Sequence, residues 1–200
     1  MKKILIALTI LLCVTGESVS EAVPFTESQF KRIFTDVTKN PAAAPESSAT
    51  FDLNSETFKE KFNSFATPIL KEITGLDDVS PMAHLFLIYD CKLFTMDGVD
   101  VFANTFGNTS ISIVGVTAPN GGNFKLLSCS YTTPEEKDDL LTAQIVLESF
   151  VRTVAPDVSA QALLGELTAE NSSGTVTKGN VKFSITEDGN LNTLTATRNQ

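Results

Sequence analysis

Residues 85–132 read LFLIYDCKLFTMDGVDVFANTFGNTSISIVGVTAPNGGNFKLLSCSYT, and this stretch decides the fold. It is rich in β-branched and aromatic residues, and its apolar positions recur with a period near two, as in strands. Gly and Asn accept the positive φ of tight turns, and connections this short join only antiparallel neighbours. Three such turn sequences interrupt the stretch: Asp97-Gly98, Gly107-Asn108 and Asn120-Gly121-Gly122. We therefore predict a four-stranded meander with strands at residues 85–96, 99–106, 109–117 and 123–132.

A helix is predicted before the meander, beginning near Asn54 or Ser55. Pro68 lies inside the pattern and should kink or end the helix, because its ring clashes with the preceding turn. Gly75 is suited to the C-terminal cap. The apolar residues of this helix repeat at helical spacing: Phe58, Phe62, Phe65, Ile69 and Ile73.

A second helix with clear boundaries follows the meander. Thr133 and Glu136 form a capping box around Pro134, and Pro156 ends the helix. Its apolar residues cover a wide face, which indicates deep burial: Leu140, Ile145, Leu147, Phe150, Val151 and Val154.

Two smaller elements come next along the chain. A short helix is predicted from Asp157 to Leu164, stopped at Gly165. A hairpin with strands at residues 175–186 and 191–197 follows it. Together the elements predict an α+β fold with one antiparallel sheet of about six strands, a four-stranded meander plus a C-terminal hairpin, packed on one face by helices. Residues 51–200 are expected to form this single domain.

This layout resembles a group of small exported bacterial proteins of unknown function. The resemblance covers residues 54–197 and rests on the helix pair Pro134–Leu167 followed by Gly174-Thr-Val-Thr-Lys-Gly-Asn-Val-Lys-Phe-Ser. It implies the same order of helix, strand meander, helix pair and hairpin. It carries over no functional residue.

Residues 1–22 have the layout of a secretory signal peptide. Lys2 and Lys3 precede the apolar run Ile4 to Val14, and small and polar residues lead to Ala22, after which we expect cleavage. The run is shorter than the roughly 20 residues that cross a bilayer. A bulky Leu precedes Cys13 where a lipoprotein signal needs a small residue, so no lipid anchor is expected. The sequence predicts a secreted or periplasmic protein.

Residues 23–39 are predicted to form an amphipathic helix, joined to the domain by a flexible tether at residues 40–50. Thr26 and Gln29 make a capping box, and Phe25 and Phe30 occupy the positions of a hydrophobic staple. The tether has no apolar residue larger than Ala, so it offers little burial to offset the entropy of ordering it. We expect the helix to dock on its own domain, because its apolar face would otherwise be exposed. The alternative is docking on a partner, which could be a second copy of the chain.

The net charge limits the classes of binding partner, and the cysteine content bears on whether the chain forms a disulfide. The net charge is −9, and an acidic surface repels nucleic-acid phosphates and anionic lipids. Outside the leader the chain has two cysteines, Cys91 and Cys129, which an oxidising compartment would allow to form a disulfide. A simple meander places them on its first and fourth strands, which are not neighbours. We therefore predict two reduced thiols, while a reordered sheet would permit the bond.

No catalytic, cofactor-binding or metal-binding residues are predicted, and no cofactor. His84 is the only histidine, which excludes sites built on several imidazoles. His84 and Cys91 stand seven residues apart, so one strand would place them on opposite faces. The acidic residues from Glu135 to Asp139 suit the first turn of a helix better than a cation site.

The aromatic residues suggest where a partner binds. If helices cover one face of the sheet, some strand aromatics must point outward, and the candidates are Phe94, Phe102 and Phe106. The favoured hypothesis is an exported, non-enzymatic module that binds a protein or a small-molecule ligand. Two alternatives stay open: a hydrolase that uses paired carboxylates outside the cytoplasm, and a structural component of the cell envelope.

Overall fold

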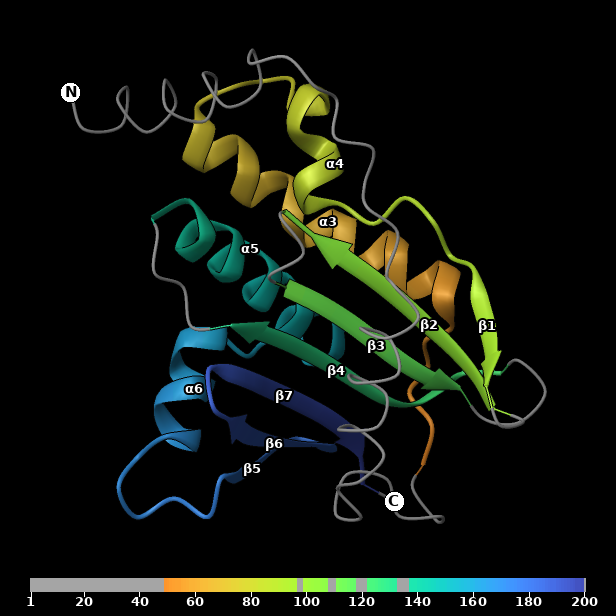
Figure 1. Ribbon diagram of the computed structural model, residues 1–200, viewed down its shortest axis with the longest axis vertical. Coiled ribbons are helices and arrows are strands. Elements are labelled where there is room, and N and C mark those ends of the chain that lie inside the picture. Colours follow the sequence, from red (N-terminus) through yellow and green to blue (C-terminus); the bar gives the residue numbers. More distant parts are fainter. Residues whose placement is uncertain (1–48, 97–98, 108–110, 118–121, 133–136, 200) are drawn as a thin grey trace.

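The computed structural model describes residues 49–96, 99–107, 111–117, 122–132 and 137–199. The predicted signal peptide, the predicted helix at residues 23–39 and most of the tether lie outside these residues. The described part is an α+β fold in which helices pack on one face of an antiparallel sheet (Figure 1).

The sheet has seven strands rather than six, in the order β1-β2-β3-β4-β7-β6-β5. The extra strand arises because residues 175–186 do not form one strand. Gly179 has a φ of 59°, and the chain turns there between β5 and β6. The strands are β1 Leu93–Met96, β2 Val99–Phe106, β3 Ile111–Thr117, β4 Phe124–Thr132, β5 Thr175–Lys178, β6 Val181–Asp188 and β7 Leu191–Arg198.

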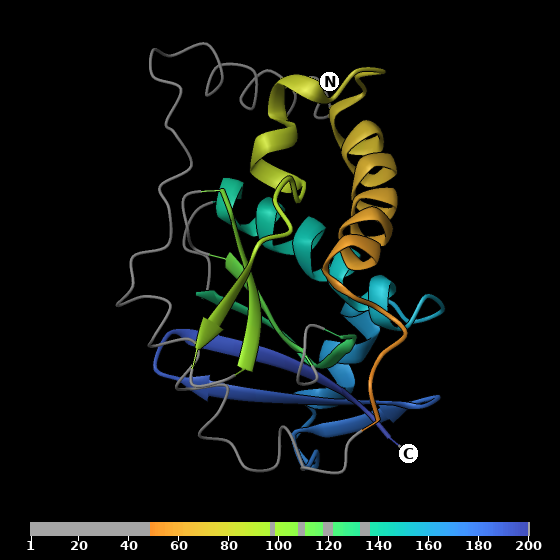
Figure 2. The same cartoon turned by 90° about the vertical axis from the view of Figure 1, so that its right-hand side faces the viewer.

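The described helices all lie on one face of the sheet, here called the inner face (Figure 2). The long helices α3 and α5 pack against each other, and the short helix α6 lies beside β5. A 3-10 turn, η1, leads into α4. The bounds are α3 Ser55–Thr74, η1 Ser80–Met82, α4 Ala83–Phe86, α5 Lys137–Val154 and α6 Ala160–Leu167.

Helix α3 begins and ends where the sequence predicts. Asn54 and Thr57 form a reciprocal capping box, and Gly75 caps the other end with a φ of 69°. The prediction that Pro68 kinks or ends the helix is wrong in one respect, because α3 continues to Thr74. Pro68 and Ser64 are both exposed, so the Ser64 carbonyl that loses its helical partner faces water.

The first predicted strand, residues 85–96, is wrong over most of its length. Its beginning belongs to α4, and only Leu93–Met96 pairs with β2. A short apolar run fits a buried helical turn as well as a strand. Here the turn packs over the end of β2, where the Gly107 N–H donates to the Leu85 carbonyl at 3.1 Å.

The core fills the space between the inner face and the helices. Phe58 of α3 meets the rings of Phe102 and Phe124, each with its centroid 5.9 Å away. From α5, Leu147, Phe150, Val151 and Val154 are buried as predicted, and so is Ile145. The prediction that Leu140 is buried is wrong, because its side chain is 47% exposed. It lies near the start of α5, which extends past the ends of the strands (Figure 1).

The short helix after α5 is displaced from its predicted position. It begins after Ser159 rather than Asp157 and runs through Gly165 to Leu167. Its start is fixed by the neighbouring helix, since the Ala160 N–H donates to Glu148 Oε2 at 2.8 Å. None of the described helices is long and apolar enough to cross a membrane.

Candidate contact surface at the β1 edge

The sheet ends at β1, and this edge carries exposed apolar side chains. Tyr89 is 62% exposed, Phe94 51% and Leu93 38%. We call these three residues the β1 edge surface. Within the described residues β1 pairs with β2 and is the terminal strand of the sheet. Such an edge is a template for a further strand.

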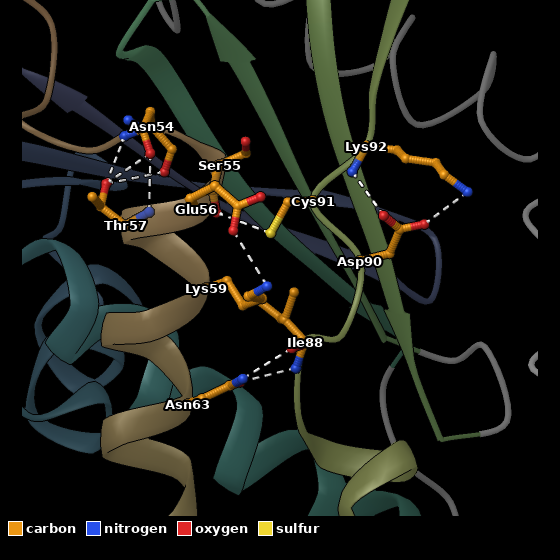
Figure 3. Close-up of polar contacts among 10 residues, drawn as sticks. All are labelled: Asn54, Ser55, Glu56, Thr57, Lys59, Asn63, Ile88, Asp90, Cys91 and Lys92. Carbon is orange, nitrogen blue, oxygen red and sulfur yellow. Dashed lines mark hydrogen bonds and ion pairs between the residues drawn. The ribbon is translucent and has the colours of Figure 1, made fainter.

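The segment leading into β1 is pinned to α3 by Asn63. The Asn63 amide donates to the Ile88 carbonyl at 2.9 Å, and its oxygen accepts from the Ile88 N–H at 2.9 Å (Figure 3). Ile88 is thereby held with its side chain in the core. The adjacent Tyr89 side chain is mostly exposed. Asn63 therefore fixes the position of one end of the β1 edge surface.

Polar contacts hold the rest of this segment. The Lys92 N–H donates to Asp90 Oδ1 at 3.0 Å, and the Lys92 ammonium lies 3.3 Å from Asp90 Oδ2. The Cys91 thiol faces the first turn of α3 and donates to the Ser55 carbonyl at 3.6 Å (Figure 3). Ile88 and Cys91 thus tie the segment to α3, while the contacts between Asp90 and Lys92 lie within the segment.

The Cys91 thiol is not suited to nucleophilic chemistry. Partial burial raises its pKa above the ordinary value, and the Glu56 carboxylate raises it further. Lys59 acts in the opposite direction but is held by Glu56, with Nζ 3.3 Å from Oε2. That contact with Glu56 is also the main reason why the Lys59 pKa is raised. The thiol stays protonated near neutral pH, whereas the thiolate is the reactive form.

Two of the three predicted contact residues need correction. Phe102 and Phe106 are buried beneath α3, where the Phe62 and Phe106 ring centroids are 5.4 Å apart, so they cannot form a contact surface. Both lie on the inner face of β2. The exposed residue of the three is Phe94, which pairs with Val101 on the opposite face.

Cys91 and Cys129 are far apart in the sheet. Cys91 precedes β1, while Cys129 is fully buried on β4 between Ile113 and Leu194. Three strand spacings separate β1 from β4, which is about 14 Å. A disulfide needs Cα atoms within about 7 Å. The arrangement favours two separate thiols, and their redox state stays a prediction.

The other candidate groups are dispersed. His84 lies exposed on α4. Asp78 serves a turn: its Oδ1 accepts from the Ser80 N–H at 2.9 Å, and hydrogen bonds from Ser80 lower its pKa. Within the described residues, every buried polar side chain is a Ser or a Thr, and no three His, Cys, Asp or Glu residues could hold a metal ion. The side chains at the start of α5, including Asp138 and Asp139, lie outside the description.

Comparison with known proteins gives no match to a family model, a curated protein or a solved structure. The local chemistry is therefore the basis for assigning a function. Sequence reasoning missed Tyr89 and Asn63 as parts of the candidate surface. Tyr89 is the last large apolar residue before Asp90, which was a usable signal, whereas nothing in the sequence links Asn63 to Ile88.

Proposed function

We propose that the protein is an exported, non-enzymatic binding module that holds an extended segment of another protein along the β1 edge surface. The observation that carries this proposal is the exposure of Tyr89, Leu93 and Phe94 at the edge of an antiparallel sheet. A bound segment would add an eighth strand beside β1.

The mode of binding follows from the geometry of the edge. Main-chain hydrogen bonds to an edge strand supply affinity, and side chains that alternate along the added strand supply specificity. The partner segment is extended and carries apolar side chains that cover Tyr89 and Phe94. Asn63 supports this mode because it holds the segment before β1 in place, so little ordering entropy is lost on binding.

The chemistry of the described residues supports binding rather than catalysis. The Cys91 thiol has a raised pKa, and the Glu148 carboxylate is occupied by Arg152 and by the start of α6. The described Asp and Glu side chains are all outside the buried class, whereas a general acid depends on burial or a like charge to raise its pKa.

Site-directed photocrosslinking tests the proposal. A photoreactive phenylalanine analogue replaces Tyr89, and the matched control carries it at Leu140, which is also apolar and exposed but lies on α5. In the native extracellular fraction we expect a discrete adduct from position 89 and none from position 140. Adding Leu93→Lys should abolish the adduct, because an edge lysine opposes strand addition.

Three results would contradict the proposal: the same adducts from both positions, no adduct from position 89, or an adduct unaffected by Leu93→Lys. An adduct with a second copy of the chain would mean that the β1 edge surface binds that copy and not another protein. Analytical ultracentrifugation of the purified chain distinguishes that case, because the proposal expects a monomer.

A further inference from the structure

The outer face of the sheet, opposite the helices, is largely buried from β2 to β7 although none of the described helices covers it (Figure 2). Phe102 points to the inner face, so Val101 beside it points outward. The register aligns Val101 with Val116, Leu126 and Thr197 in one row across four strands. Val101 has no exposed surface, Leu126 and Thr197 are also buried, and Val116 is half-buried.

The next row of the outer face is buried on β3, β4 and β7, and half-buried on β2. It consists of Ala103, Val114, Ser128 and Thr195. Val114 is 1% exposed and Ser128 has no exposed surface. Side chains this small cannot screen one another from water on an open sheet. Burial of two adjacent rows indicates that another part of the molecule lies over them.

We propose that residues 23–39 form a helix that lies across the outer face over Val101, Val114 and Leu126, so that the sheet has helices on both faces. This inference does not depend on the proposed binding function. The described chain begins at Ala49, which forms a β-bridge with Arg198, the neighbour of Thr197 in the first row. The described chain therefore begins next to the first outer row.

The length of the tether permits this docking. Residues 40–48 can extend by about 3.3 Å each, or roughly 30 Å in all. The distance from β7 to β2 is three strand spacings, about 14 Å. A helix held by so short a tether has an effective concentration in the millimolar range. Docking on its own domain is therefore favoured over docking on a second copy.

The two surfaces are complementary. The helix has large apolar residues along one side, Phe30, Ile33, Phe34 and Val37, which span about 10 Å of its axis. The apolar part of the outer face extends from β2 to β4, also about 10 Å. Apart from Leu126, the outer rows carry small side chains, so bulky rings from the helix can approach the sheet closely.

Thiol labelling in the full-length exported chain tests this docking. Ser128→Cys places a reporter on the outer face, and native Cys129, the next residue of β4, reports the inner face of the same strand. Both thiols should react slowly with a maleimide. The helix variant Phe30→Asp with Phe34→Asp should speed labelling at position 128 at least about tenfold while Cys129 stays protected.

Thr35→Asp is the matched control, because it adds a charge on the opposite side of the same helix and should leave position 128 protected. Fast labelling at position 128 in the parent, or no change in the double variant, would overturn the proposal. If the double variant also speeds labelling of Cys129, the milder variant Phe34→Ala replaces it. An equal increase in labelling rate at positions 128 and 129 in Phe34→Ala would overturn the proposal. If position 128 loses its protection from maleimide on dilution of the protein, a second copy of the chain covers the outer face, which would overturn the proposal.

Discussion

The two faces of the sheet bury side chains of different sizes. The inner face contributes four buried rings, of which Phe102, Phe106 and Phe124 contact aromatic rings of α3, and the fourth is Phe183. The outer face contributes Leu126 and otherwise Val, Ala, Ser and Thr along the same strands. Large rings pack closely on the inner face and leave few alternative arrangements of its side chains. Apart from Leu126, the outer residues are small, and a separate segment can pack over them.

The largest effect is expected from Phe58→Ala. It removes a fully buried ring from contact with Phe102 and Phe124, and should cost about 3–5 kcal/mol of unfolding free energy. Thr186→Val, at an exposed position on the outer face, is the comparison, expected within about 0.5 kcal/mol of the parent. Urea unfolding with matched m-values measures both. Equal losses would remove the distinction between the faces.

Gly115→Ala should be the next most damaging. A Cβ at Gly115 would lie 2.6 Å from a Phe124 ring carbon on the inner face, which overpacks the core by about 1–3 kcal/mol. Gly165→Ala is the matched change, because nothing lies within 4 Å of its Cβ. As an interior residue of α6, that alanine should stabilise by about 0.5–1 kcal/mol. Opposite shifts in thermal midpoint are expected.

Asn63→Ala should cost about 1–2 kcal/mol, because it leaves the backbone of Ile88 without both hydrogen bonds. Amide exchange at Ile88 should accelerate, and the crosslink from position 89 should weaken. Ser64→Ala, on the exposed side of α3, is the control and should change neither. A normal Ile88 exchange rate in Asn63→Ala would mean that the segment before β1 is held by other contacts.

The smallest effect concerns reactivity. Because its pKa is raised, Cys91 should alkylate more slowly than a model thiol at pH 8, and its rate should keep rising above the pH at which a model thiol levels off. Glu56→Gln removes a negative charge, lowers that pKa and should increase the rate at pH 8. Lys59→Met should decrease it, since the ammonium favours the thiolate. The same rate in all three proteins would contradict this electrostatic assignment.

A companion measurement addresses the oxidation state. Without reductant, Cys91 should label in the native protein and Cys129 only after unfolding. A mass 2 Da lower with no labelling after unfolding would instead reveal a disulfide.

The sequence predicted the elements whose signals are local. Asn54 and Gly75 bound α3 because capping depends on a few adjacent residues, and the α+β class followed from the order of elements. The turn at Gly179 was also local, but the apolar alternation of Val181 and Phe183 led to one long strand being predicted. The signal peptide and the helix at residues 23–39 stay predictions.

The candidate surface was less predictable because it depends on packing between distant segments. In β3, Ile111, Ile113 and Val114 are all buried, so periodicity does not reveal which face the helices cover. Phe102 and Phe106 could therefore be placed outside by mistake. Leu93 is exposed for a related reason, since β1 is an edge strand, and that follows only from the complete strand order.

The strand order also has a consequence for biosynthesis. β7, which follows every other strand in the chain, occupies a position inside the sheet between β4 and β6. A nascent chain can form the β1–β4 meander early, but its β4 edge stays open until β7 has emerged from the ribosome. Pairings between residues distant in sequence are slow to form. The sheet therefore stays divided into two parts until β7 has been synthesised, and a chain paused before that point would expose the buried edge of β4.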